Sequence, residues 1–216
     1  MNLNELSKPL PIDRVDFRVQ SVNNGGYATI LAYKDARVDM DRLDEVVGKN
    51  NWQKKYEIIN GSLYCSVGIY DSDKKEWIWK QDVGSESNTE AEKGVASDSF
   101  KRACVNWGIG RELYAYPMIS VKLDSSEIDK SKPKPTTSWG FKLKEWKWSS
   151  SFTEEGSLIS LVGVDTSGVE RFRYTRHILT KVQFEATLEA KPDQIKTVLD
   201  KFDMTPSQRS QLEALV

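Results

Sequence analysis

The spacing of hydrophobic positions along the first half of the chain indicates a mixture of strands and helices. Apolar side chains at Val38, Leu43, Val46 and Val47 predict a helix over residues 36–47 that ends at Gly48. Alternating or apolar runs predict strands at residues 17–22, 27–33, 52–59, 63–70 and 77–83. Asn60–Gly61, a dipeptide typical of tight hairpins, joins the third and fourth of these strands. The last three strands therefore predict an antiparallel meander.

The most informative pattern is a helix predicted from Lys93 to the glycines Gly108 and Gly110. Its apolar residues recur at spacings of four, three and four, and they are Ala96, Phe100, Ala103 and Trp107. Such spacing buries one face of a helix, so this helix is expected to cross the meander. We expect the two glycines to end it in the left-handed conformation.

The charged side chains of the same helix lie outside its apolar stripe. Lys101 and Arg102 fall on the opposite side, and Lys93 falls at the edge of the stripe. Thr89 and Glu92 predict a capping box at the start of the helix. The charged face is typical of a helix that holds a polyanion, but it also fits a solvated face in which Asp98 pairs with Arg102.

Composition limits the classes of function. The chain has 216 residues, of which 38% are hydrophobic and 29% charged, with a net charge of −1. Nucleic-acid binding would therefore depend on a local basic patch. No apolar run is long enough to span a bilayer and the polar start does not resemble a signal peptide, so we expect a cytoplasmic protein. Cys65 and Cys104 lack metal-ligand spacing and are expected to be small buried groups.

The second half of the chain suggests a separate region. A polar, proline-bearing segment at residues 125–138 predicts a linker between a core at 1–124 and a region at 139–216. The latter is expected to hold a small sheet, built from an aromatic–basic strand near 139–148 and strands near 158–164 and 169–174, followed by two short helices that begin at Pro192 and Pro206. This division predicts that a chain ending near Asp124 stays soluble.

Several motifs occur together in one order between Tyr33 and Tyr114. They are Y-K-D-A-R-V, V-V-G-K-N-N-W, the G-x-x-Y strand at Gly61–Tyr64, the D-V-G strand end at Asp82–Gly84, and K-x-x-x-S-D-x-x-K-R-A at Lys93–Ala103. In this order they resemble the single-strand annealing family of homologous recombination, which includes the eukaryotic Rad fifty-two protein and bacterial and phage relatives such as DdrA. The length favours a phage or bacterial member.

The resemblance implies an α+β fold, namely a β-β-β-α core in which a long helix crosses an antiparallel meander. It further implies homo-oligomeric rings or filaments with single-stranded DNA in a basic groove. Lys101, Arg102 and Arg37 match family positions in that groove, and Lys75 matches a lysine of an outer DNA path. Val105 stands where eukaryotic members have an arginine, so either the groove is less charged here or Lys93 or Arg111 compensates.

The function implied by the resemblance is annealing of complementary strands during recombination and double-strand break repair. It assigns oligomerisation, DNA binding and annealing to the core at 1–124, so a chain ending near Asp124 should still oligomerise and anneal strands. Annealing makes and breaks no bond, so we expect no enzyme activity, ATP requirement, cofactor or metal. A single-strand-binding protein or a recombinase is the candidate partner of the C-terminal region. Two alternatives stay open: a scaffold that loads a recombinase, and a metal-dependent nuclease built on Asp129, Glu145 and Lys147.

Other interpretations of the same residues also stay open. Arg37 could pair with Asp39 or Asp41, and Lys75 could be solvated surface. Phe141, Trp146 and Trp148 of the aromatic–basic strand could stack nucleobases or lie in the core. The lone His177 carries no catalytic signal, and Gly108–Ile109–Gly110 ends a helix where a nucleotide loop would open one.

Overall fold

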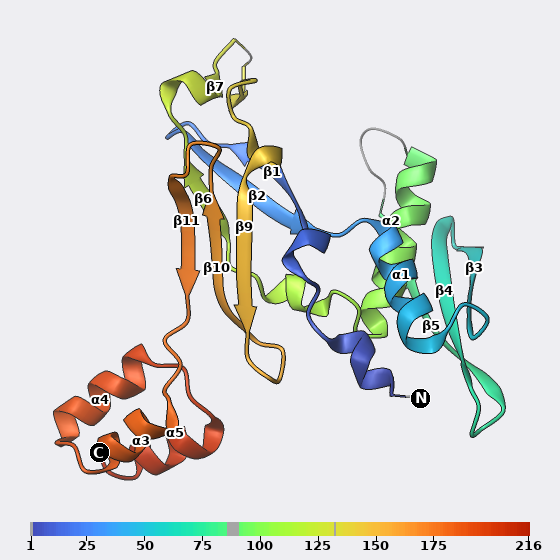
Figure 1. Cartoon of the computed structure of the whole chain (residues 1–216). Helices are drawn as coiled ribbons and strands as arrows, with labels where there is room; N and C mark the ends of the chain where they lie inside the picture. Colours follow the sequence, from blue (N-terminus) through green and yellow to red (C-terminus); the bar gives the residue numbers. More distant parts are fainter. Residues whose placement is uncertain (1, 86–90, 132) are drawn as a thin grey trace.

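The structure, a computed structural model, describes residues 2–85, 91–131 and 133–216, with residues 91–93 as backbone only. Three antiparallel three-stranded sheets organise the chain (Figure 1). The first sheet has the order β1-β2-β6, from β1 (Asp16–Val22), β2 (Tyr27–Tyr33) and β6 (Ile119–Lys122). The second has the order β3-β4-β5, from β3 (Trp52–Ile59), β4 (Ser62–Asp71) and β5 (Glu76–Val83). The third has the order β11-β10-β9, from β9 (Lys147–Phe152), β10 (Leu158–Val164) and β11 (Glu170–Thr175).

The second sheet is the meander expected from the sequence. Asn60 and Gly61 have φ values of 52° and 80°, as a hairpin turn with two left-handed residues requires. Helix α2 (Ala91–Asn106) packs against β4 and β5, and α1 (Ala36–Val47) contacts both α2 and β3. Figure 1 shows both helices beside this sheet. The expected α+β arrangement, a meander crossed by a long helix, is therefore confirmed.

The first and third sheets lie next to each other (Figure 1). β6 contacts β11, and β1 contacts the 3₁₀ turn η5 (Leu143–Glu145) that precedes β9. Buried side chains from Leu6 to Leu161 form a single apolar cluster that runs through all three sheets. The third sheet therefore shares its core with the first half of the chain.

The third sheet contains the strands expected near 158–164 and 169–174, but its first strand begins only at Lys147. The residues before it form a turn and η5, in which Phe141 and Trp146 are each 8% exposed. These two aromatic rings meet edge to face with centroids 5.3 Å apart. They belong to the core, so they are not available to stack nucleobases.

The segment assigned to a linker has local structure. It contains η4 (Ser125–Glu127) and a two-stranded sheet of β7 (Ile128–Asp129) and β8 (Thr136–Thr137). The Arg171 guanidinium of β11 donates to Glu127 at 2.8 Å, to Asp165 at 3.2 Å and to the Lys122 carbonyl at 2.8 Å. These bonds join the segment to the third sheet. The division of the chain at 124 and 139 stays a prediction, which truncation can test.

The C-terminal tail forms a helical unit below the third sheet in Figure 1. Both expected helices are present as α4 (Pro192–Lys201) and α5 (Pro206–Glu213), and α3 (Lys181–Leu188) precedes them. Leu179, Ile195 and Leu212 form a small apolar cluster of their own. The remaining 3₁₀ turns are η1 (Leu3–Ser7), η2 (Ile12–Arg14) and η3 (Arg111–Ala115). Within the described residues, no helix is both long and apolar enough to cross a membrane.

Candidate nucleic-acid interface

Helix α2 is fixed against the meander by its apolar stripe. Phe100 is 1% exposed, Ala103 and Trp107 are buried as the spacing predicts, and Ala96 is half-buried. The indole nitrogen of Trp107 donates to the Val67 carbonyl of β4 at 3.0 Å. Lys101 and Arg102, in contrast, are only half-buried. The predicted orientation of α2 is confirmed.

Two glycines allow close contacts near α2. At Gly84, directly after β5, a Cβ atom would lie 2.3 Å from the Val95 carbonyl, so only glycine allows this close approach. At the other end Gly110 has a φ of 69° and lies against Lys34. The capping box predicted from Thr89 and Glu92 involves side chains outside the described part of the structure.

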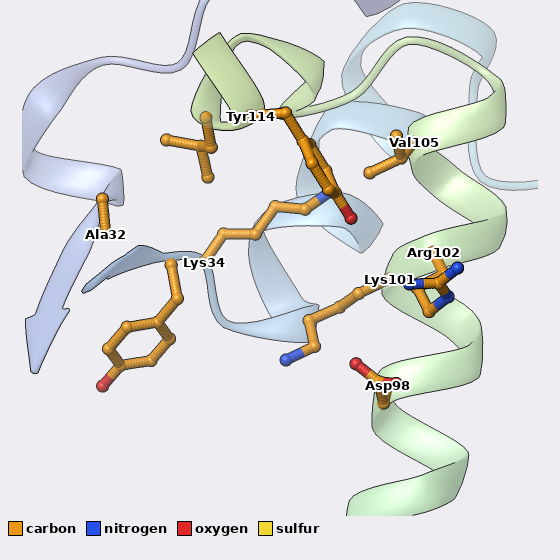
Figure 2. A pocket seen from close by; sticks show the side chains of 10 residues that line it. Ala32, Lys34, Asp98, Lys101, Arg102, Val105 and Tyr114 are labelled. Carbon is orange, nitrogen blue, oxygen red and sulfur yellow. The ribbon is translucent and has the colours of Figure 1, made fainter. Parts of the chain in front are cut away.

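A hollow of about 240 Å³ opens between α2, the end of β2 and η3. Figure 2 shows Lys101 and Arg102 on α2, with Tyr114 extending towards them from η3. Tyr33, the last residue of β2, and Lys34, which follows it, also line the hollow. The two basic residues singled out on α2 therefore lie in one depression, with cations and aromatic rings in its wall.

Arg102 has a partner other than the expected one. Its Nε donates to Asp82 Oδ1 of β5 at 3.2 Å, and 43% of its side chain stays exposed. Asp98 instead accepts bonds from the amide and hydroxyl of Ser85, at 2.9 and 3.0 Å. The interpretation that Asp98 and Arg102 pair along the helix is therefore wrong. The pair with Asp82 orients the guanidinium and leaves part of it accessible to a ligand.

Lys101 carries a charge that no described carboxylate pairs with directly. None of the ion pairs among the described residues includes it. Its charge nevertheless acts on Asp35, since hydrogen bonds from Arg37 lower the pKa of Asp35 and the ammonium of Lys101 adds to this effect. Lys101 is thus a half-buried cation in the wall of the hollow, outside the ion pairs of the described residues.

Arg37 lies at the first turn of α1. Its Nε donates to Asp35 Oδ1 at 2.8 Å, and 83% of its side chain is exposed. Asp35 is also the N-cap of α1, because its carboxylate accepts from the Arg37 amide at 2.9 Å. The alternative pairs are wrong, since Asp39 is bound to Lys34 and Asp41 to Arg14. Asp35 therefore connects Arg37 electrostatically with Lys101 in the hollow.

Comparison with known proteins identifies the family of this chain. A sequence model of the Rad52/22 family double-strand break repair proteins matches residues 2–132. The chain belongs to this family. The match confirms the resemblance drawn from the motifs, and it extends beyond the 33–114 stretch that carried them.

Two curated relatives in Deinococcus are named single-stranded DNA-binding protein DdrA. The Deinococcus radiodurans protein is 33% identical over 115 residues, which are 52% of this chain and 54% of the relative. The Deinococcus deserti protein is 28% identical over 137 residues, which are 62% of this chain and 67% of the relative. The chain spans about half the length of the first of these relatives.

Val105, where the family resemblance implies an arginine in eukaryotic members, also lines the hollow. The Arg111 guanidinium reaches back to this turn and donates to the Val105 carbonyl at 2.9 Å and to the Asn106 carbonyl at 3.2 Å. Arg111 therefore caps the last carbonyls of α2 and brings a positive charge close to Val105.

The remaining basic residues named from the sequence do not line the hollow where the structure describes their side chains. Lys75 is exposed in the turn between β4 and β5, with a φ of 56°, and it is not among the described residues that line the depression. The side chain of Lys93, near the start of α2, lies outside the description. Among the predicted residues with described side chains, only Lys101 and Arg102 line the hollow, and Arg37 pairs with Asp35, whose pKa Lys101 also lowers.

Sequence reasoning missed a buried ion pair next to the hollow. The Lys34 ammonium contacts Asp39 Oδ1 and donates to the Ile109 carbonyl at 2.6 Å. Asp39 is 0% exposed and its second carboxylate oxygen has no partner among the described residues. Burial raises the pKa of Asp39 to about 6, against the opposing effect of Lys34. The burial of Asp39 was predictable from the sequence, because Asp39 lies four residues before Leu43 and eight before Val47, on the buried face of α1.

The residues of the nuclease alternative are held in local contacts. Glu145 pairs with Lys142 at 3.8 Å, and Asp129 accepts from the Ser131 amide at 2.9 Å. Among the described residues, no group of three or more His, Cys, Asp and Glu side chains is placed to hold a metal ion. Cys65 and Cys104 are both buried thiols, as expected.

Proposed function

We propose that this chain binds single-stranded DNA through the hollow beside α2 and anneals complementary strands in double-strand break repair and homologous recombination. The observation that carries the proposal is the placement of Lys101 and Arg102 in one accessible depression on a helix whose other face is buried. Membership of the Rad52/22 family and the name of the DdrA relatives support the same ligand.

The physical requirements of annealing fit this site. Two strands repel each other through their phosphates, so a protein that neutralises phosphate charge brings them together without forming or breaking a bond. Lysine and arginine contacts to phosphate leave the base edges free to find a complement. The proposal therefore assigns no catalytic residue, no ATP and no metal to the reaction.

Assembly and location belong to the proposal as well. We infer that the chain works as a homo-oligomer, a ring or a filament, in the cytoplasm of a bacterium or of a phage's host. A net charge of −1 supports self-association, because copies with almost no net charge repel each other weakly. The C-terminal region is the part we assign to a protein partner, a single-strand-binding protein or a recombinase, because it lies outside the family match at 2–132.

Binding and annealing assays with naked oligonucleotides test the proposal. We expect binding whose affinity falls on a log–log scale with a slope of about −0.7 per phosphate contacted as salt rises. Replacement of both Lys101 and Arg102 by alanine should weaken binding at least about tenfold. Replacement of Lys196 and Lys201, two exposed lysines of α4, removes the same charge elsewhere and serves as the control. Equal affinity of the two double variants would contradict the assignment of the site.

The annealing assay separates this proposal from the scaffold alternative. A protein that only loads a recombinase would bind single strands but would not accelerate the pairing of two complementary naked strands. We expect acceleration by the wild-type chain and its loss in the Lys101 and Arg102 double variant.

A further inference from the structure

The hollow beside α2 contains two tyrosines from distant parts of the chain. Tyr33 comes from the end of β2 and Tyr114 from η3, and both line the depression that holds Lys101 and Arg102. Tyr114 is 70% exposed, and Figure 2 shows it extending from η3 towards the basic residues of α2. Tyr33 is 36% exposed.

An exposed tyrosine alone carries little meaning, since single exposed aromatic residues are common on protein surfaces. The surroundings of these two are more specific. The Arg18 guanidinium lies 5.9 Å from the centroid of the Tyr33 ring, and Lys101 and Arg102 share the depression with both rings. Cationic groups next to accessible aromatic faces are the combination that single-strand binders use for phosphate and base together.

We propose that Tyr33 and Tyr114 hold a nucleobase by stacking while Lys101 and Arg102 contact the adjoining phosphates. This inference rests on the proposed function and adds the part of the nucleotide that the hollow recognises. Phosphate contacts alone would treat any polyanion alike, whereas the two rings give the site a preference for a strand that carries bases.

Stacking is compatible with annealing for a geometric reason. A tyrosine ring covers the π face of a base and leaves its Watson–Crick edge exposed at the side. A base held in this way can still pair with a complementary strand. Every base has a π face, so the contact adds affinity without sequence preference.

The test compares a thymidine oligonucleotide with an abasic oligonucleotide of equal length, which has the same phosphates and no bases. Tyr114→Ala and Tyr33→Ala should each weaken binding of the thymidine strand about fivefold or more and leave binding of the abasic strand unchanged. Tyr114→Phe and Tyr33→Phe should retain wild-type affinity because the ring remains. Tyr114→Leu and Tyr33→Leu, which keep apolar bulk without a ring, should behave like the alanine variants.

Tyr27 supplies the matched control. It lies at the other end of β2, is 43% exposed and has the Lys122 ammonium 4.6 Å from its ring centroid, yet it does not line the hollow. Tyr27→Ala should therefore bind both oligonucleotides like the wild type. The same loss in this variant as in Tyr33→Ala would overturn the inference.

Other results separate this inference from the proposed function. If the tyrosine variants weaken both oligonucleotides equally, or neither, the rings do not contact bases and the inference fails while the proposed function stands. If the alanine and phenylalanine variants alike change the oligomeric mass, the rings belong to an interface between copies, which also overturns it. If the wild type binds neither oligonucleotide, both proposals fail.

Discussion

Trp148 of β9 stacks on Phe17 of β1, with ring centroids 3.8 Å apart and ring planes 9° apart. Trp146 also stacks with Trp148, with ring centroids 6.0 Å apart. The contact joins a strand inside the family match to one that lies beyond residue 132. The third sheet is therefore packed on the family core, and this changes what truncation of the chain should do.

A chain ending at Asp124 would lose Trp146 and Trp148 and leave Phe17 uncovered. We now expect such a chain to aggregate or to unfold at a lower temperature, in contrast to the soluble fragment that the sequence predicted. A chain ending at Thr175 keeps the third sheet and serves as the comparison, which should remain soluble. Size-exclusion chromatography and thermal unfolding decide between the two results, and a well-folded, annealing-competent chain ending at Asp124 would restore the original division.

Asp35→Asn should strengthen binding of single-stranded DNA. Asparagine caps a helix as well as aspartate does, so α1 should keep its start. The substitution removes a negative charge that pairs with Arg37 and lies near Lys101. We expect an affinity gain of about twofold or more at low salt, measured by fluorescence anisotropy. Asp41→Asn removes a carboxylate of the same helix that pairs with Arg14 and acts on Arg37 less than Asp35 does, so its gain should be smaller.

Asp39 should give the stability of the fold a specific dependence on pH. Burial raises its pKa from the ordinary 3.8 to about 6. Between these two pH values Asp39 is therefore mostly ionised in the unfolded chain and mostly protonated in the folded chain. The contribution of Asp39 to the free energy of unfolding is therefore fully present below pH 3.8 and is lost as the pH rises through 6. Carboxylates with a lowered pKa, such as Asp35, act in the opposite direction, so a single profile does not isolate Asp39.

The contribution of Asp39 is isolated by comparing the wild type with Asp39→Asn, because the contributions of the other titratable groups are the same in both proteins and cancel in the difference. Between pH 4 and 6, roughly the interval of that titration, the wild type should lose stability relative to the variant, as measured by urea unfolding at a series of pH values. Parallel profiles for the two proteins would show that Asp39 stays ionised in the folded chain.

Gly110→Ala tests the contact between the loop after α2 and Lys34. A Cβ atom at residue 110 would lie 2.8 Å from Lys34 Cδ, in a backbone with a φ of 69°. Gly61 has a similar φ of 80° but open space around it, so Gly61→Ala measures the backbone strain alone, about 1–2 kcal/mol. We expect Gly110→Ala to lower the free energy of unfolding by at least about 1 kcal/mol more. Equal losses of unfolding free energy in Gly110→Ala and Gly61→Ala would mean that the Lys34 side chain moves aside at no cost.

The parts of the fold that follow from local sequence were predictable. The meander, α1 and the orientation of α2 follow from the spacing of apolar side chains and from a turn dipeptide, and the burial of Phe100 confirms that spacing. The placement of Lys101 and Arg102 opposite that stripe follows in the same way. These features are determined by residues that lie a few positions apart in the sequence, so the sequence pattern predicts them directly.

Features that depend on distant contacts were not predictable. The bond from Lys34 to the Ile109 carbonyl and the partner of Arg102 arise only once the elements are packed. Helix α3 was missed because its apolar residues form no stripe, with Val182 75% exposed. Its start did carry a signal, since Thr180 and Gln183 form a capping box.

The tail helices have an apolar cluster separate from that of the sheets, built around Leu179, Ile195 and Leu212. So small a cluster stabilises its helices only weakly, and the helices can open without disturbing the cluster that holds α2. Amide hydrogens of α3, α4 and α5 should therefore exchange with solvent well before those of β4 and α2. We therefore expect the chain to open as two cooperative units of unequal stability, so that a partner bound to the tail would leave the proposed DNA site unchanged.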